Sequence, residues 1–347
     1  MTTSDAVRSG GPAAAPHTST APTARHDRPA ARPLTRRGLL TGATATAAAL
    51  ALAACGGRTS PVSAGRPARS PGAAAGSSAA GGTLRIGAIP DQDPEVLQRL
   101  YGTVADSMTK GTGLQVTYVP VTDYAAAVSL FRTGDLDLVW FGGLTGVQAR
   151  LQTPGARVIA QRDIDAGFHS VFLVNTSTGL AAAEDLGKLA GLRFTYGSQT
   201  STSGFLMPAY FLHQQGVDPE GFPGGPGFSG SHDATLQLVA SGSYQAGVLN
   251  EQVWSSRSQA GTVDPAVQLY QRTPAFHDYH WVLGPEAVDR LGEDLPRRLE
   301  RYFLGLSVDD PAGKAVLDLF GARSFIATKD SNYDQIEAIG EQLGLIS

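Results

Sequence analysis

Hydrophobic and polar positions alternate from Thr83 onward in a way that predicts strands and helices in turn. The segments "TLRIGAIP" (83–90), "LQVTYVPV" (114–121) and "LDLVWFGG" (136–143) are short, apolar and rich in β-branched or aromatic residues, as expected of strands. The segments between them carry apolar residues at helical spacing and stop at glycines. This β-α-β-α-β order predicts an α/β fold with a largely parallel sheet.

The same alternation restarts near residue 192. Strands are predicted at 192–197 and 244–250 and in the late segment "HDYHWVLG" (277–284), with helices between and after them. Two α/β units with a late return strand predict a chain that crosses twice between two lobes, near 172–176 and near 273–279. We therefore expect a ligand cleft between lobe 1, containing residues 83–174 and 276–347, and lobe 2, containing residues 175–275.

The N-terminal region has the features of an export signal, which we assign to residues 1–54. Arg36 and Arg37 precede a weakly apolar run that is too short for an ordinary membrane span, and the paired arginines fit a twin-arginine signal. The run ends in "LAAC", which resembles a lipobox with Cys55 as the lipidated residue; the alternative is a chance cysteine in an Ala-rich segment. Residues 55–82 then form a Gly/Ser/Ala/Pro linker. This predicts a folded body tethered by lipid to the outer face of the cytoplasmic membrane.

Charge and cysteine content exclude some classes of partner. Cys55 is the only cysteine of the 347 residues, which excludes an internal disulfide. The net charge is −4, and without residues 1–54 the chain keeps 21 basic and 29 acidic side chains, a net charge of −8. Such a body would repel the phosphate backbone of a nucleic acid. Any bound anion must therefore be held by a local site.

Four loops at the carboxyl ends of predicted strands could form that site. Each precedes a predicted helix and so offers unpaired backbone N–H groups and the positive end of a helix dipole. The most informative is "SQTSTSGF" (198–205), whose three consecutive hydroxyls could donate hydrogen bonds to one tetrahedral oxyanion. The alternative is an ordinary N-cap, which needs one Ser or Thr. The four loops are Thr122–Tyr124, Phe141–Gly143, Ser201–Ser203 and Ser229–Asp233.

The residue patterns argue against an enzyme. Ser203, His232 and Asp278 could be assembled into a triad, but Ser201 stands where a G-x-S-x-G motif needs its first glycine. The spacings typical of zinc sites are absent, as is the G-x-x-x-x-G-K-[ST] phosphate loop. We therefore expect a binding protein without a metal or cofactor.

Four motifs in this order resemble one family. "VPVTDYAAAV", "DLVWFGG", "STSGF-x-x-P-x-Y" and "SGSHDATLQLVASG" are similar to segments of the phosphate/phosphite/phosphonate-type substrate-binding proteins of ABC importers. The resemblance covers about residues 83–347. It implies a type II periplasmic-binding-protein fold, two lobes joined by a two-strand hinge, that closes on its ligand and delivers it to a permease and its ATPase. We expect a monomer.

The resemblance also implies roles for individual residues. The S-T-S triplet would hold the oxyanion, and the tyrosine of the D-Y segment, the histidine at the next helix start and two acids would complete the pocket. Where phosphonate binders often have tyrosine, this chain has Phe141, which makes the pocket more apolar and argues against an aminoalkyl phosphonate. The implied ligand-binding residues are Tyr124, Phe141, Ser201, Thr202, Ser203, His232, Glu251 and Asp278.

The identity of the anion stays open at this point. Ionised Glu251 and Asp278 can only accept hydrogen bonds, so they would repel sulfate or selenate and favour a ligand that carries a donor, such as phosphite or a phosphonate with an amine. Against this, "IPDQDP" (89–94) and "VWFGG" are similar to a branch of the family associated with selenate uptake. The expected ligand is a small tetrahedral phosphonate, phosphite or phosphate-like anion, with selenate as the competitor. A sensing module that reports to a membrane receptor is the alternative from another class.

Overall fold

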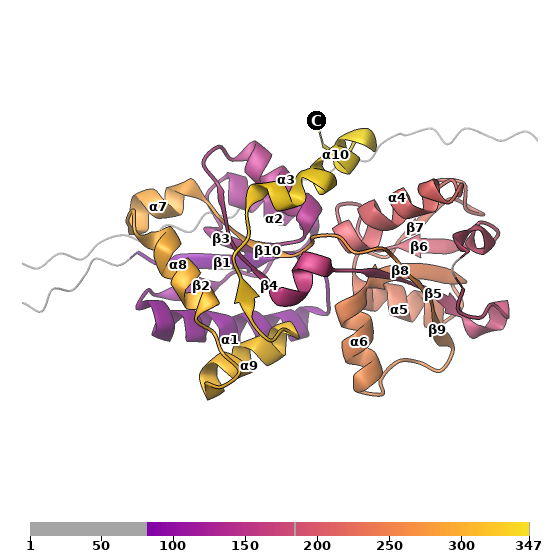
Figure 1. Ribbon diagram of the computed structural model, residues 1–347, viewed down its shortest axis with the longest axis horizontal. Coiled ribbons are helices and arrows are strands. Elements are labelled where there is room, and N and C mark those ends of the chain that lie inside the picture. The colour runs from indigo at the N-terminus through magenta and orange to yellow at the C-terminus, as the bar shows by residue number, and fades with distance from the viewer. Residues whose placement is uncertain (1–81, 184, 347) are drawn as a thin grey trace, which may run out of the picture. The chain divides into compact units, whose positions relative to one another are not determined.

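The computed structural model describes residues 82–183 and 185–346, and these contain two β-sheets (Figure 1). The sheet of lobe 1 has the strand order β11-β4-β10-β3-β1-β2. β1, β2 and β3 are parallel, whereas β10 and β11 run antiparallel to their neighbours. The strands are β1 (Leu84–Ala88), β2 (Val116–Tyr118), β3 (Leu138–Phe141), β4 (Arg157–Arg162), β10 (His280–Leu283) and β11 (Phe325–Ile326).

The sheet of lobe 2 has the order β7-β6-β8-β5-β9. β6, β7 and β8 are parallel, and β5 lies antiparallel between β8 and β9. Both sheets are therefore mixed rather than largely parallel, because β10 and β5, the strands that enter each lobe after a crossing, run against the others, as does β11. The strands are β5 (Ser170–Asn175), β6 (Phe194–Tyr196), β7 (Gly227–Phe228), β8 (Ala246–Asn250) and β9 (Val267–Arg272).

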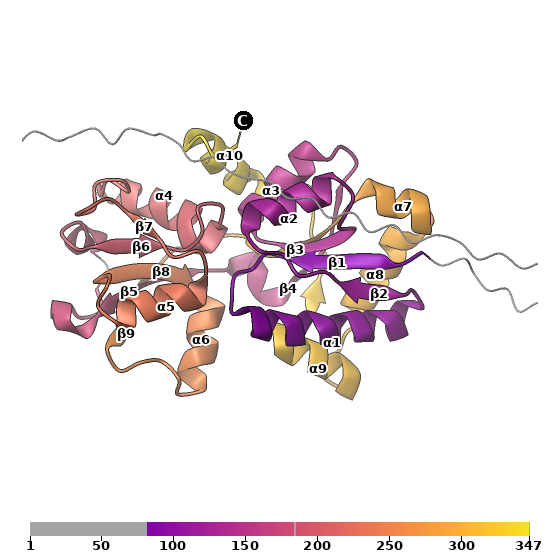
Figure 2. The same cartoon turned by 180° about the vertical axis from the view of Figure 1, so that it is seen from behind.

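Helices cover both faces of each sheet, which explains why β3, β5 and β8 are buried along their whole length (Figures 1 and 2). In lobe 1, α1 (Pro94–Thr112) and α9 (Pro311–Phe320) lie on one face, and α2 (Tyr124–Arg132) and α3 (Gly143–Gln152) on the other. In lobe 2, α4 (Met207–Gln214) lies opposite α5 (His232–Ala240) and α6 (Glu251–Gln259). The remaining helices are α7 (Pro285–Leu291), α8 (Leu295–Leu304) and α10 (Asp334–Gln342).

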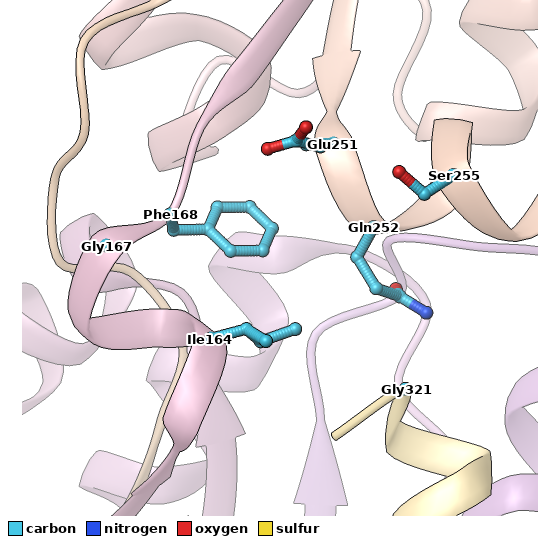
Figure 3. A pocket seen from close by; sticks show the side chains of 7 residues that line it. All are labelled: Ile164, Gly167, Phe168, Glu251, Gln252, Ser255 and Gly321. Atoms are coloured by element: carbon cyan, nitrogen blue, oxygen red, sulfur yellow. The ribbon is translucent and has the colours of Figure 1, made fainter. Parts of the chain in front are cut away.

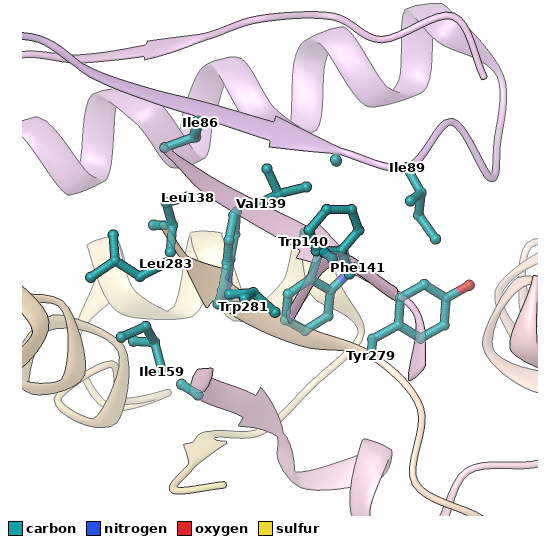
Figure 4. Packing of buried hydrophobic residues seen from close by; sticks show 14 of the residues in the cluster. Ile86, Ile89, Leu138, Val139, Trp140, Phe141, Ile159, Tyr279, Trp281 and Leu283 are labelled. Carbon is teal, nitrogen blue, oxygen red and sulfur yellow. The ribbon is translucent and has the colours of Figure 1, made fainter. Parts of the chain in front are cut away.

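Packed aromatic side chains fill the core of lobe 1 at the end of the sheet that faces lobe 2 (Figure 4). Trp140 of β3 packs on Trp281 of β10 and stacks on Tyr279, with 5.8 Å between the last pair of ring centroids. The guanidinium of the buried Arg162 lies 5.0 Å from the Tyr279 ring and is paired with Asp165. These contacts fix the backbone where β3 and β10 meet the loops that face lobe 2.

The first crossing between the lobes differs from its prediction. β5 belongs to the sheet of lobe 2, so lobe 1 ends before Ser170 and not at residue 174. Phe168 and Phe276 pair in an isolated bridge, which makes 167–169 and 273–279 the two connecting segments. The apolar run "FHSVFLVN" passes through the crossing and into β5 without a break, so its pattern could not show where the lobes divide.

The predicted signal, Cys55 and nearly all of the predicted linker lie outside the described residues. Within 82–183 and 185–346, no helix combines the length and the apolar character that a membrane span needs.

Candidate functional site

Buried polar side chains gather where the two lobes meet. Strands β1, β3, β6 and β8 end there, and the helices that follow them begin there, as is usual for ligand sites in α/β sheets. Each of these side chains belongs to a residue that is less than a tenth exposed. We call them the buried polar cluster: Asp91, Tyr124, Ser201, Thr202, Ser203, His232, Asn250, Asp278 and Tyr279.

The predicted hydroxyl triplet opens a single π-helical turn, Thr202–Leu206, just before α4. Ser201 caps this turn: its Oγ accepts from the N–H of Gly204 at 2.9 Å, and its carbonyl accepts from Leu206 at 3.0 Å. A Cβ on Gly204 would lie 2.9 Å from Ser201 Oγ, so glycine is required for this tight turn. Single π-turns of this kind occur frequently at functional sites.

Thr202 and Ser203 differ from Ser201 in their partners. Thr202 Oγ1 accepts from the N–H of Leu144, in the first turn of α3, at 2.8 Å, which leaves its hydroxyl hydrogen available to donate. Ser203 Oγ is buried and has no hydrogen-bond partner among the described residues. The triplet thus supplies one self-capping hydroxyl, one that lobe 1 orients and one that is unpartnered.

Asp278 is the acid of the cluster that faces these hydroxyls. Its Oδ1 accepts from the N–H of Gly143 at 2.9 Å, while its buried Oδ2 has no partner in the described part of the chain. Burial raises the pKa of Asp278 to about 7, against the opposing effects of Gly143, Ser203 and Thr202. Near neutral pH the carboxyl can therefore either accept a hydrogen bond or donate one.

Tyr124 is the first residue of α2, and Asp123 caps that helix through the N–H of Ala126 at 2.8 Å. The Tyr124 hydroxyl is buried and makes no hydrogen bond within the described residues, although Ser201 lies near enough to affect its pKa. Burial, together with the charge of Asp91, raises the pKa of Tyr124 well above its usual value. Tyr124 is thus a neutral donor.

His232 begins α5 directly after the capping residue Ser231. Its Nδ1 accepts from the backbone N–H of Asn250 at 3.4 Å, and its Nε2 lies 3.4 Å from the hydroxyl of Tyr279. Burial lowers the pKa of His232 to about 4. The ring is therefore neutral at neutral pH, and because Nδ1 accepts, Nε2 carries the hydrogen.

Three members of the cluster were missed by sequence reasoning: Asp91, Asn250 and Tyr279. Tyr279 donates to Asp91 Oδ2 and accepts from Asn250 Nδ2, both at 2.9 Å. Burial raises the pKa of Asp91 to about 6, which the bond from Tyr279 partly offsets. Asp91 follows β1 and Asn250 ends β8, so the strand-end rule could have found both. Tyr279 gave no signal beyond its place next to Asp278.

Phe141 does not join the cluster. Its ring is fully buried in the core of lobe 1 (Figure 4). It packs edge-to-face on Phe131, with 5.6 Å between the ring centroids. Neighbouring residues of a strand point to opposite faces, and here Trp140 packs toward Tyr279 while Phe141 packs under α2. This segment reaches the cluster through the backbone of Gly142 and Gly143.

Glu251 does not join the cluster either. It begins α6, forms an ion pair with Arg272 and lines a separate pocket of about 290 Å³ beside Phe168 (Figure 3). Asn250, one residue earlier, caps α6 through Val253 and bonds to Tyr279. Because Asn250 and Glu251 are adjacent, only one of the two side chains turns toward the cluster.

The arrangement suits a small oxyanion held without a formal positive charge. The cluster contains no Lys or Arg; it offers neutral hydroxyl and imidazole donors together with the starts of α2, α3 and α5. In the part of the chain that the structure describes, no group of three or more His, Cys, Asp or Glu could hold a metal ion.

Comparison with known proteins identifies the family. Residues 86–333 match the model of the "ABC transporter, phosphonate, periplasmic substrate-binding protein" family. The "Probable ABC transporter phosphite binding protein PhnD1" of Prochlorococcus marinus (strain MIT 9301) is 47% identical over 268 residues, which are 76% of this chain and 90% of that protein. The "Phosphate-import protein PhnD" of Mycolicibacterium smegmatis is 28% identical over 243 residues, covering 60% and 70%.

Solved structures agree with the fold. The structure of PhnD1 from Prochlorococcus marinus in complex with methylphosphonate superimposes with a TM-score of 0.74, covering 76% of this chain and 99% of that one. A binding protein component of an ABC phosphonate transporter from Pseudomonas aeruginosa is 21% identical, with a TM-score of 0.66 and coverage of 74% and 85%. These neighbours confirm the expected type II periplasmic-binding-protein fold. The chain belongs to the family of periplasmic substrate-binding proteins of phosphonate ABC transporters, which are extracytoplasmic binding components that serve a permease and ATPase and are not enzymes.

Proposed function

We propose that this protein captures a small phosphorus oxyanion, methylphosphonate or phosphite, and passes it to its permease. The observation that carries the proposal is that Ser203 Oγ and Asp278 Oδ2 are both buried and form no hydrogen bond among the described residues, although Ser203 lies near enough to lower the pKa of Asp278. One can donate a hydrogen bond to an anionic oxygen and the other can accept one from a protonated oxygen. The 47% identical relative, whose structure holds methylphosphonate, supports the same ligand class.

The ligand-binding residues that we propose are the buried polar cluster. Tyr124, Ser203 and His232 donate to the anionic oxygens as neutral groups, and Thr202 donates from the hydroxyl that Leu144 orients. Ser201 shapes the turn and, with its remaining hydrogen, donates as well. Asp278 faces the one oxygen that carries a proton. Each hydrogen bond to a charged ligand is worth about 1.5–3 kcal/mol, so several together offset the missing cation.

A proton between Asp278 and a ligand oxygen should let the site distinguish phosphorus anions from sulfate and selenate. Phosphite and alkylphosphonates lose their last P–OH proton only around neutral pH, so a substantial fraction of each still carries a P–OH whose hydrogen bond ionised Asp278 can accept. Sulfate and selenate carry no proton at that pH, so they require Asp278 in its protonated form. Because the pKa of Asp278 is about 7, their binding should improve as the pH falls, and the phosphorus anions should be favoured at neutral pH.

Ligands with an amine find few acceptors in this arrangement. Glu251 is turned away and paired with Arg272, and the Asp91 carboxylate already accepts from Tyr279. Asp278 remains, and it is needed for the protonated oxygen. We therefore propose that aminoalkylphosphonates bind more weakly than methylphosphonate.

Calorimetry with a ligand panel tests the proposal. The panel contains methylphosphonate, phosphite, phosphate, 2-aminoethylphosphonate, sulfate and selenate, each at pH 6 and pH 8. We expect methylphosphonate and phosphite to bind most tightly, and sulfate and selenate to gain affinity at pH 6. Tightest binding of selenate at pH 8 would overturn the assignment in favour of the competing ligand.

We further propose that the protein is a monomer held at the membrane by a lipid on Cys55 after export by the twin-arginine route. The "LAAC" segment supports the lipid anchor, and the paired arginines support the export route. Cys55→Ala should move the protein from the membrane fraction to the soluble fraction of cells, whereas a membrane-bound variant would contradict the anchor. Light scattering of the folded body, residues 83–347, tests the oligomeric state.

A further inference from the structure

A pair of hydrogen bonds joins the lobes at the edge of the buried polar cluster, at the start of α5. Asp233 Oδ2 of lobe 2 accepts from the backbone N–H of Asp93 in lobe 1 at 2.9 Å. The backbone N–H of the preceding residue, His232, donates to the carbonyl of Asp91 at 2.9 Å. Two consecutive residues of α5 thus hold two positions of the loop between β1 and α1, which Figure 2 shows beside α5.

Arg257 holds the Asp233 carboxylate in the orientation that this contact needs. Arg257, in α6, donates from Nη2 to Asp233 Oδ1 at 2.8 Å, and the side chains of Arg257 and Asp233 are 38% and 12% exposed. Both residues belong to lobe 2, so their ion pair does not require the lobes to touch. The other carboxylate oxygen is left to accept from lobe 1.

The position of Asp233 separates it from the ligand groups. It lines a surface hollow of about 340 Å³ whose wall comes from both lobes, with Asp93 and Val96 on one side and Leu236, Arg257 and Thr262 on the other. Asp233 therefore bonds across the boundary at its rim, whereas its neighbour His232 is fully buried.

We propose that Asp233, oriented by Arg257, is a positioning residue that stabilises the contact between the lobes and so sets how long the ligand stays bound. The inference rests on the proposed binding function. The contact brings Asp91 and His232, which come from different lobes, into one cluster. When binding requires the lobes to meet, the observed affinity scales with the fraction of molecules in which they do. Loss of the contact then weakens binding without removing any ligand contact.

The test uses methylphosphonate as the probe and the folded body with four sets of substitutions. Asp233→Ala removes the contact, Arg257→Gln leaves the carboxylate unoriented, and the double variant combines them. Asp318→Asn, which breaks the exposed pair with Lys314 in α9, is the matched control. Stopped-flow measurements give the association and dissociation rate constants, and thermal unfolding of the ligand-free variants checks their folding.

We expect Asp233→Ala to raise the dissociation rate constant about 10-fold and Arg257→Gln about 3-fold, with association changed less than 2-fold. The double variant should match Asp233→Ala, because Arg257 acts through Asp233. The Asp318→Asn control should match wild type. Wild-type dissociation in Asp233→Ala, with the wild type binding methylphosphonate, would overturn the inference. Failure of the wild type to bind would instead count against the proposed function, so the two results are distinguishable. Because Arg257 is partly exposed, Arg257→Gln tests the inference even if Asp233→Ala does not fold.

Discussion

Two helical elements at the lobe boundary find partners for their first backbone N–H groups in different ways. One is α3 in lobe 1, and the other is the π-turn before α4 in lobe 2. The π-turn caps itself, since Ser201 accepts from Gly204. The start of α3 has no side-chain cap of its own: its first amides, on Gly143 and Leu144, donate to Asp278 and to Thr202 of lobe 2. A self-capped turn can present hydroxyls whether or not the lobes touch. The start of α3 gains all of these partners only when the lobes touch, because Thr202 belongs to lobe 2. Contact between the lobes therefore completes the hydrogen bonding of a helix start in lobe 1.

The largest expected effect comes from removing the hydroxyls of lobe 2. Replacing Ser201, Thr202 and Ser203 together by Ala should weaken methylphosphonate binding by several kcal/mol, since each lost bond to a charged ligand costs about 1.5–3 kcal/mol. Calorimetry measures the loss. An unchanged affinity would mean that the π-turn is only a helix cap. The single variant Ser203→Ala separates the ligand role from the capping role of Ser201.

Asp278→Asn should have the next largest effect. It should weaken ligand binding but make the ligand-free protein more stable. The neutral amide can still accept from Gly143, but it is a weaker partner for a protonated ligand oxygen, so affinity should fall by about 1.5–3 kcal/mol at pH 7. The pKa of Asp278 is raised from 3.8 when unfolded to about 7 when folded, so its ionisation opposes folding progressively as the pH rises between these values.

The ligand-free Asp278→Asn variant should therefore be more stable than wild type at pH 8, with the difference shrinking toward pH 4. Thermal unfolding across this range measures it. Equal stability of the two proteins at both ends of the range would contradict the raised pKa.

Gly142→Ala, at the start of α3 in lobe 1, should weaken methylphosphonate binding moderately. Its backbone is extended, so alanine brings no strain, but its Cβ would lie 3.2 Å from both Thr202 Oγ1 and Asp278 Oδ1. Crowding at this contact should weaken binding about 10-fold, by roughly 1–2 kcal/mol. Gly102→Ala in α1 is the control, because a Cβ there meets nothing within 4 Å. Equal affinities of the two variants would show that the lobes do not meet closely at Gly142.

The smallest effect is expected for Glu251→Gln. Glu251 pairs with the half-exposed Arg272 away from the buried polar cluster, so calorimetry should show methylphosphonate affinity within 2-fold of wild type. Stability should change by less than about 1 kcal/mol, as is typical of exposed ion pairs. A loss of affinity comparable to that of Asp278→Asn would show that Glu251 does take part in ligand binding.

Sequence patterns predicted much of the fold and six of the nine residues of the buried polar cluster. The strand–helix alternation predicted two α/β units and the second crossing region, and hydroxyls before a helix drew attention to Ser201–Ser203. Two predicted site residues lie outside the buried polar cluster, and in each case the neighbouring residue in the sequence contacts it instead. Phe141 lies in the core while Gly142 meets Thr202, and Glu251 turns to Arg272 while Asn250 meets Tyr279.

The sequence by itself determined most of the strands, though not β7, β9 or β11, together with the helix starts and the stock of neutral donors, because periodicity, capping and composition are local properties of the chain. Only the tertiary structure decided which of two neighbours faces the buried polar cluster, and that Asp91, Tyr279 and Asn250 form one network. Side chains in a strand alternate between faces, and a shift of one residue at a strand end exchanges core for site. Contacts such as Asp93 with Asp233 join residues 140 positions apart, and no local pattern records which lobe surface they will meet.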